Sequence, residues 1–283
     1  MFPSPLQQAR PAMRLLYGTL LAVSLLIWLL PLAALMLTAM RSTQEIHLGQ
    51  YWSWPTLDHW RENLRQVFAT SPMWIFLRNS LLITVPSVLG ALSIASLAGF
   101  ALAKYRLRGN LWLLGLFVSG NFVPFQILIL PVRSSMIWLG LYDQIIGLIL
   151  FHTAFQTGFC TLFLRNFMRT IPDALLDAAR LEGASEWRLF WSVVLPQMRP
   201  ALAALAVLVF TFVWNDYFWA LVLTQSEQAQ PVTLGLQSLH GYWVASWNLL
   251  SAGALLAAIP PVLLFFAMQK HFIAGLSFGA VKE

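Results

Sequence analysis

The chain has 283 residues, of which 59% are hydrophobic and 10% are charged, and its mean hydropathy is +0.70. Soluble domains carry roughly 25% charged residues and disordered chains are polar, so this composition excludes both classes. A single cysteine excludes a disulfide framework and a zinc site built on cysteines. We therefore expect an all-α membrane protein whose helices cross the bilayer several times.

Six membrane-spanning helices are predicted, because about 20 consecutive apolar residues cross a bilayer as a helix. The first span is too long for the apolar region of a signal peptide and lacks a good cleavage site, so we expect it to be retained. The predicted spans are residues 15–40, a segment between Arg78 and Lys104, one between Arg108 and Arg133, one between Asp143 and Arg165, residues 201–224, and residues 248–268.

The net charge of +6 is explained by membrane topology and needs no nucleic-acid partner. With six spans and a cytoplasmic N-terminus, both termini are cytoplasmic and 12 of the 17 Lys and Arg residues lie on that side. This asymmetry follows the positive-inside rule. The predicted parts are a cytoplasmic N-terminus 1–14, the first span 15–40, an external loop 41–77, a core 78–270 that includes a cytoplasmic loop 165–200, and a cytoplasmic tail 271–283.

Aromatic side chains are frequent in the predicted external loops 41–77 and 225–247. Such rings settle at the membrane–water interface, or they form a platform on which a polar ligand or a partner docks. Both interpretations stay open from the sequence. The rings are those of Tyr51, Trp52, Trp54, Trp60, Trp74, Tyr242, Trp243 and Trp247.

The second predicted span carries small residues at every fourth position, namely Ser87, Ala91, Ala95, Gly99 and Ala103. A spacing of four places them on one stripe of a helix. Small residues allow a neighbouring backbone to approach closely in a membrane. This helix is therefore expected to be buried in a bundle, with the stripe against another helix.

Polar residues inside the predicted spans are candidates for a translocation path, because such residues are costly in a membrane. Asp216 either faces a water-filled cavity or caps a break in its helix. His152 has no His or carboxylate one turn away, which favours an interhelical hydrogen bond over a metal site. The candidates for the path are Asn121, Gln126, Gln156, Trp214, Asn215, Asp216 and Tyr217.

No catalytic constellation is visible, since the Gly-x-Ser-x-Gly elbow and the His-Glu-x-x-His motif are both absent. A Walker A motif is also absent, so the chain is not expected to bind ATP through a P-loop or to be an enzyme. Cys160 is expected to be a small packing residue. No metal and no cofactor of its own is predicted for this chain.

The cytoplasmic loop 165–200 is predicted to form two short helices joined by a turn. Thr170 with Asp173 gives a start like a capping box, and Pro172 suits a first helical turn. Gly183 can end this helix, and Ser185 can cap a second one that runs towards Leu195 and Pro196. A helical elbow projecting from a membrane bundle is typical of an interaction device.

The same loop resembles a known signature. Permease subunits of binding-protein-dependent ABC importers carry Glu-Ala-Ala, three residues, Gly, nine residues and Ile-x-Leu-Pro. Here Asp177-Ala178-Ala179 is followed by Gly183 and by residues 193–196, Val-Val-Leu-Pro, at the same spacing. Asp for Glu and Val for Ile are the departures. Residues 78–81 resemble the start of the permease core, and Thr56-Leu57 with Trp60 resembles the family's external loop. Residues 214–217, 275–276 and 279–282 resemble the carbohydrate branch, specifically its maltose-permease-G-like members.

This resemblance implies a type I importer (MetI-like) permease core in a bacterial inner membrane. It implies a heterodimeric pore with a second permease subunit, two cytoplasmic ATPase subunits that hold ATP and Mg, and an extracytoplasmic solute-binding protein. The implied solute is a sugar or a related polyol. The residues that would couple to the ATPase are Asp177, Ala178, Ala179, Gly183, Leu195 and Pro196.

An ion-coupled secondary transporter is the alternative. It should show an internal repeat and a relay of intramembrane ionisable groups. The two halves of the chain show no repeat, and only His152 and Asp216 offer such groups.

Overall fold

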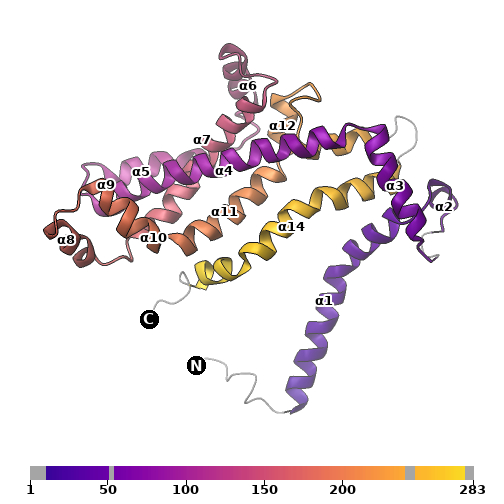
Figure 1. Ribbon diagram of the computed structural model, residues 1–283, viewed down its shortest axis with the longest axis horizontal. Helices are drawn as coiled ribbons and strands as arrows, with labels where there is room; N and C mark the ends of the chain where they lie inside the picture. The colour runs from indigo at the N-terminus through magenta and orange to yellow at the C-terminus, as the bar shows by residue number, and fades with distance from the viewer. Residues whose placement is uncertain (1–10, 51–53, 240–245, 278–283) are drawn as a thin grey trace. The chain divides into compact units, whose positions relative to one another are not determined.

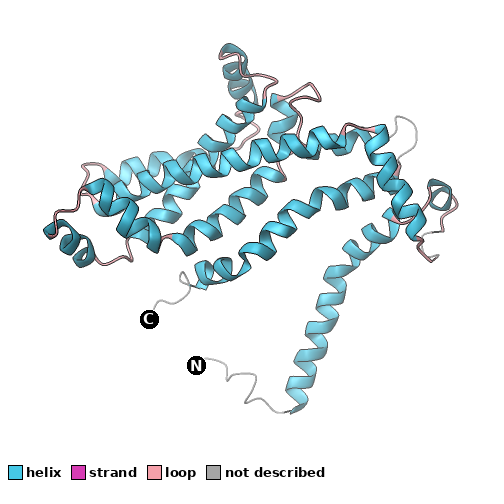
Figure 2. Ribbon diagram, viewed as in Figure 1, coloured by secondary structure: helices cyan, strands magenta, loops and turns pink. Residues whose placement is uncertain are grey.

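The computed structural model describes residues 11–50, 54–239 and 246–277, and within these ranges the regular structure is helical throughout (Figures 1 and 2). Helices satisfy every backbone hydrogen bond within one segment, which is what a bilayer demands of an apolar chain. The chain divides into two units, residues 1–71 with 238–256 and residues 72–237 with 257–283. Of the aromatic residues predicted at the interface, Tyr51, Trp52, Tyr242 and Trp243 lie outside the described ranges, as do residues 1–10 and 278–283.

The elements of the first unit are α1 (Pro11–Ala39), α2 (Thr43–His47), α3 (Leu57–Thr70) and the beginning of α14 (Trp247–Ser277). In this unit, the buried side chain of Asn63 connects α3 with the end of α1 and with α14. Its Nδ2 donates to the carbonyl oxygens of Ala39 at 2.9 Å and Arg41 at 2.8 Å, and its Oδ1 accepts from Asn248 Nδ2 at 2.8 Å. These bonds fix the corner at which the first helix ends.

The second unit is centred on three helices, α4 (Met73–Lys104), α7 (Ile145–Met168) and α11 (Arg199–Trp214). The predicted small-residue stripe of α4 is confirmed as a packing surface, since Ser87, Ala91, Ala95 and Gly99 are buried and Ala103 is half-buried. It faces α7, because a Cβ at Gly99 would lie 3.1 Å from the backbone nitrogen of Arg165.

Shorter elements surround these three helices. They are α5 (Asn110–Ser119), η2 (Gly120–Phe122), α6 (Ile129–Trp138), α8 (Asp173–Leu181), α9 (Glu186–Arg188), the π-helical η3 (Leu189–Val194), α10 (Leu195–Gln197), α12 (Phe218–Leu223) and α13 (Val232–Gly235). The short η4 (Leu236–Leu239) follows α13.

Four helices in the described ranges are long and apolar enough to cross a membrane, namely α1, α4, α7 and residues 247–270 of α14. A fifth span is counted if the two helical stretches 186–197 and 199–214, which meet at an angle of 74°, form one bent span. The predicted six spans are therefore not confirmed.

The third predicted span is where the structure differs, because residues 108–133 do not form one helix. The segment α5 ends at Ser119, η2 follows, and α6 begins only at Ile129. Val123 adopts an extended conformation (φ −75°, ψ 123°) directly before Pro124. Proline disfavours the helical conformation of the residue before it and has no N–H to donate, so apolar composition alone does not make this segment continuous.

The fifth predicted span, residues 201–224, is also interrupted. The helix α11 ends at Trp214 and α12 begins at Phe218. Residues 215–217 between them form the helix break, a name kept below for this segment.

Candidate functional site

The loop predicted to be cytoplasmic folds as the expected pair of helices joined by a glycine turn, and we call residues 173–197 the elbow. Gly183 has a φ of +83°, a left-handed conformation that suits glycine. The amide of Ala184 donates to Ala179 O at 3.0 Å and the amide of Gly183 donates to Arg180 O at 2.9 Å. This pair of bonds is the Schellman motif that ends a helix.

The two ends of the elbow were predicted with different success. Ser185 caps the second helix as expected, since its Oγ accepts from the amide of Arg188 at 3.3 Å. The capping box predicted at Thr170 is wrong, because Thr170 Oγ1 donates backwards to Phe167 O at 2.7 Å and α8 has no side-chain cap. The carboxylate of Asp173 instead accepts from Lys104.

The residues of the signature are mostly exposed or half-buried, and the apolar core of the elbow is formed largely by their neighbours. Asp177, Ala178 and Gly183 are exposed, and Ala179 is half-buried. Leu195 is half-buried, and Pro196 is exposed. The apolar core of the elbow is made by Leu176, Leu189, Phe190 and Val194, all buried.

Leu181, the last residue of α8, has 91% of its surface exposed. An exposed leucine at the tip of a helix ending is a surface that a partner protein can cover.

A charged cluster covers the outer side of the elbow. Arg180 Nη1 donates to Asp177 Oδ1 and Arg180 Nε donates to Glu186 Oε1, both at 3.0 Å. The guanidinium therefore joins the two helices across the glycine turn. The neighbouring carboxylates raise the pKa of Arg180, with the hydrogen bond to Glu186 as the main cause, so this cation stays charged at any physiological pH.

Asp216 caps the helix break, which is one of the two roles that the sequence left open. Its carboxylate accepts from the backbone amides of Trp219 at 3.3 Å and Ala220 at 3.0 Å, in the first turn of α12. The sequence favoured an interhelical hydrogen bond for His152, and the structure places its Nε2 3.5 Å from Asp216 Oδ2. The break in the fifth predicted span is thus joined to the middle of α7.

The other path candidates lie in the helix break, in α7 and in the segment before α6. Asn215 and Gln126 are exposed and Gln156 is half-buried. The hydroxyl of Tyr217, which is 37% exposed, bonds with Gln237 Nε2. The rings of Phe125 and Phe218 are 4.7 Å apart, which places the segment that carries Gln126 beside α12.

Two path candidates need separate statements. Trp214 is buried, and its indole N–H donates to Ala257 O at 3.0 Å while its ring stacks on Phe210. Its side chain therefore packs inside the unit and does not line an open path in this structure. Asn121 lies in η2, and its side chain is outside the described part of the chain.

Sequence reasoning missed the residues that hold the loop 224–232 against the start of α4. Asn79 Nδ2 lies 2.9–3.2 Å from the carbonyl oxygens of Glu227, Gln228 and Gln230, and Ser80 Oγ accepts from the amide of Val232 at 2.8 Å. Asp143 Oδ1 accepts from the amides of Gln225 at 2.7 Å and Ser226 at 2.8 Å. Asp143 also has a φ of +58°, which no sequence motif signalled.

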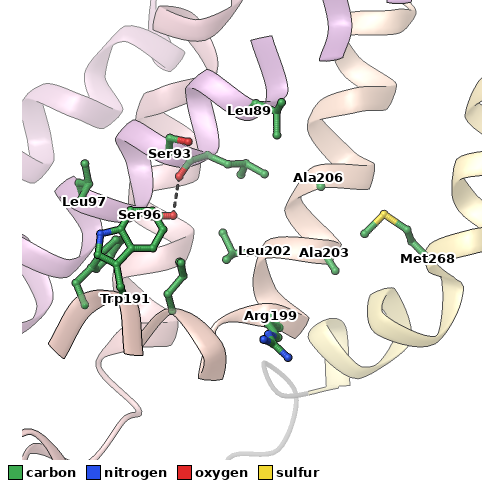
Figure 3. Close-up of a pocket in the computed structure, with 13 residues that line it drawn as sticks. Leu89, Ser93, Ser96, Leu97, Trp191, Arg199, Leu202, Ala203, Ala206 and Met268 are labelled. Carbon is green, nitrogen blue, oxygen red and sulfur yellow. Dashed lines mark hydrogen bonds between the residues drawn. The ribbon is translucent and has the colours of Figure 1, made fainter. Parts of the chain in front are cut away.

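A groove of about 440 Å³ lies between α4, η3, α11 and α14 (Figure 3). Its walls are mostly leucine and alanine, with Ser93 and Ser96 on one side and Arg199 at one end. The hydroxyl of Ser96 donates its proton to Leu92 O within α4. Such an apolar groove does not suit a hydroxyl-rich ligand.

The described residues contain no group of three or more His, Cys, Asp or Glu side chains that could hold a metal ion. Cys160 is buried in α7, as expected of a packing residue.

A family model described as the binding-protein-dependent transport system inner membrane component matches residues 73–277. A probable ABC transporter permease protein of Pyrococcus horikoshii is 41% identical over 186 residues, 65% of this chain and 68% of that protein. The osmoprotective compounds uptake permease of Synechocystis is 34% identical over 91% of this chain and 88% of its own. The arabinooligosaccharides transport system permease of Halalkalibacterium halodurans is 33% identical over 78% of this chain and 79% of its own.

The same fold occurs in a solved structure. A chain of a bacterial ABC transporter involved in the import of the acidic polysaccharide alginate superposes with a TM-score of 0.80 and 23% identity, over 96% of this chain and 99% of that one.

Proposed function

Because the chain belongs to the family of inner membrane components of binding-protein-dependent transport systems, we propose that it forms half of a heterodimeric pore of an ATP-driven importer. Two cytoplasmic ATPase subunits bind ATP and Mg and drive the pore, and an extracytoplasmic protein delivers the solute. The chain itself contributes no ATP site. Both of its termini lie in the cytoplasm, in keeping with the distribution of basic residues.

The observation that carries this proposal is the elbow. Asp177, Ala178, Ala179 and Gly183 form the side that docks on the ATPase, and the exposed Leu181 adds apolar area to that contact. Leu195 and Pro196 connect the elbow to α11 and pass on its displacement. Small residues at the contact allow the backbones of the two proteins to approach closely.

The proposed solute is a carbohydrate or a related polyol. The candidates for contacting it are the neutral polar side chains of Gln126, Gln156, Asn215 and Tyr217, with Asn121 as a further prediction. Amide and phenol groups suit hydroxyl-rich solutes because they both donate and accept hydrogen bonds. The arabinooligosaccharide permease among the relatives supports the same class. Asp216 and Trp214 shape the helix break rather than contact the solute.

The decisive experiment is affinity purification of the full chain from its native membranes in detergent, followed by measurement of the ATPase activity that co-purifies with it. We expect an ATPase to co-purify with the wild type and to be largely lost from Leu181→Asp, which places a charge in the contact. Leu107→Asp is the matched control, because Leu107 is also exposed and lies on the same predicted side of the membrane but outside the elbow. Equal ATPase recovery from both variants would contradict docking at the elbow.

Uptake measurements separate this proposal from an ion-coupled transporter, which the pair His152–Asp216 favours. Uptake of radiolabelled arabinooligosaccharide into cells that express the complex should depend on ATP and persist when an ionophore collapses the ion gradients. Uptake that the ionophore abolishes at constant ATP would favour the alternative.

A further inference from the structure

The last residue of α4 and the one that follows it contact both helices of the elbow. Lys104 ends α4, and its side chain is 3% exposed although it carries a charge. Its Nζ donates to Asp173 Oδ1 at 2.7 Å and to Ile171 O at 2.6 Å, at the start of α8. A buried ammonium group requires such partners, because an unpaired charge away from water is costly. Lys104 therefore fixes the beginning of α8 to α4.

Tyr105 follows directly and reaches the second helix of the elbow. Its hydroxyl donates to Glu186 Oε2, at the first position of α9. The other oxygen of Glu186 accepts from Arg180, which in turn bonds to Asp177 of the signature. The ring of Tyr105 packs edge-on against Phe100, which also contacts Phe190 of η3. Tyr105 is thus linked both to the charged cluster and to the apolar core of the elbow.

Two separate contacts with α4 and its end restrain the orientation of the elbow more than one contact does. A single contact lets the elbow rotate about it, whereas contacts at the starts of α8 and α9 fix its orientation relative to α4. The helix α4 is itself packed against α7 along the small-residue stripe. A force applied to the elbow is then transmitted to α4 and to the helix against which it packs.

We propose that Lys104 and Tyr105 are positioning residues that make the elbow and α4 move as one body when the ATPase subunits close. This inference rests on the proposed function and adds to it the residues that transmit the movement. The hydrogen bond to Lys104 and its charge hold the pKa of Asp173 below its usual range, so this attachment persists throughout physiological pH.

The opposing hypothesis is that apolar packing alone holds the elbow. Leu176, Leu189 and Phe190 are buried and would remain so if both polar attachments were removed. The two hypotheses therefore differ in the movement of α4 and agree on the folding of the elbow and its binding of the ATPase.

The test uses the complex purified from native membranes, with a reporter cysteine at Gln225, an exposed position in the loop held by α4, in a Cys160→Ser background. The rate of labelling by a maleimide is compared with and without ATP, Mg and vanadate. Tyr105→Phe removes only the hydroxyl, and Lys104→Met keeps the aliphatic stem but removes the charge. Arg106→Met is the matched control, an exposed neighbouring cation outside both attachments.

In a double variant that combines Lys104→Met with Tyr105→Phe, we expect the nucleotide-dependent change in labelling to fall about tenfold, as for loss of a hydrogen bond to a charged group. The amount of ATPase bound to the double variant should stay at the wild-type level. The single change Lys104→Arg keeps the positive charge and should retain most of the labelling response. The Arg106→Met control should respond like the wild type.

Two results would overturn the proposal. An unchanged response in the double variant would show that apolar packing suffices. Loss of the ATPase in proportion to the response would show that the residues only fold the elbow. A wild-type reporter that does not respond to nucleotide, or a wild type with no ATPase bound, would instead refute the proposed function.

Discussion

His152 Nε2 and Asp216 Oδ2 are 3.5 Å apart, and both side chains are largely withdrawn from solvent. The histidine comes from α7 and the carboxylate from the helix break, so the contact joins two elements that are 64 residues apart in sequence. Asp216 also accepts from two amides of α12. The carboxylate of Asp216 therefore caps the helix that follows the break and also contacts α7.

A double-mutant cycle on this pair should reveal the coupling. Asp216→Asn keeps one acceptor for the amides of α12 but loses the charge, and His152→Leu removes the imidazole. Residues in contact show interaction energies of roughly 0.5–3 kcal/mol, so the two losses in thermal stability should not add. Additive losses would mean that the 3.5 Å approach contributes no energy. Asn215→Ala, a change at the exposed neighbour, should cost less than Asp216→Ala.

Gly99→Ala should destabilise the protein although alanine favours helices. The added Cβ would lie 3.1 Å from the backbone nitrogen of Arg165 and 3.4 Å from Leu164 Cβ, so α4 and α7 must move apart. Overpacking of this kind costs about 1–3 kcal/mol. Gly115→Ala is the matched control, because a Cβ at that helical glycine would have nothing within 4 Å and the change should gain up to about 1 kcal/mol. Thermal unfolding of the two purified variants compares them, and equal midpoints would contradict the close approach of α4 and α7.

Gly183→Val should impair the elbow through its backbone alone. No atom lies within 4 Å of a Cβ at this position, but the φ of +83° strains a β-branched residue. Such strain costs of order 1–3 kcal/mol, so the Schellman ending should open and the recovery of bound ATPase should fall. Gly183→Asn is the control, since asparagine tolerates the left-handed conformation. If both variants retain the ATPase equally, the geometry of this turn does not matter for docking.

Asn79→Asp should destabilise the protein strongly, although the two side chains are nearly equal in size. The amide that donates among three carbonyl oxygens would become a carboxylate facing them, inside a site where Asn79 is 1% exposed. Leaving buried polar groups unpaired costs about 1–3 kcal/mol, and more when a charge is involved. Faster proteolysis within residues 224–232 and a lower unfolding midpoint would show the loss. Gln144→Glu, which removes one exposed bond to Gly140 O, should change neither.

The contribution of Asp143 to stability should persist at acidic pH. Burial raises its pKa, but the amides of Ser226 and Gln225 that donate to it outweigh burial and bring the pKa below the usual 3.8. A lowered pKa in the folded state means that the stabilisation is complete above the unfolded value and is lost as the pH falls through the folded one. The difference in unfolding midpoint between the wild type and Asp143→Ala should therefore be constant from neutral pH to about pH 5 and shrink below about pH 4. A difference that already shrinks near pH 6 would contradict this assignment. Asp143→Asn, which keeps an acceptor and tolerates the positive φ, should lose less.

Local patterns predicted the parts of the fold that local interactions determine. A spacing of four places Ser87, Ala91, Ala95 and Gly99 on one stripe whatever the helix packs against, and the structure confirms that this stripe is buried. The elbow was equally predictable from the sequence, because the glycine that ends α8 and the serine that caps α9 form hydrogen bonds with residues only one or two turns away. The capping box at Thr170 failed because α8 begins at Asp173 with Pro172 at its N-cap, and the carboxylate of Asp173 binds Lys104, a residue distant in sequence.

The continuity of a membrane segment was less predictable than its hydropathy. Residues 108–133 and 201–224 are apolar enough to be predicted as single helices, yet both are interrupted. In the first case Val123 is extended directly before Pro124, a residue that disfavours a helical conformation of its predecessor. In the second, Asp216 stabilises an interruption by accepting the amides that a continuous helix would have bonded internally.

The sequence by itself determined the membrane class, the helical elbow with its signature spacing, and the family. These follow from composition and from contacts between residues a few positions apart. Only the tertiary structure decided that His152 meets Asp216, that Lys104 meets Asp173 across 69 residues, and that Asn79 holds a loop about 150 residues away. Each of these pairings depends on which helices become neighbours. A single polar side chain in an apolar segment must find some partner, but its sequence surroundings do not specify which one.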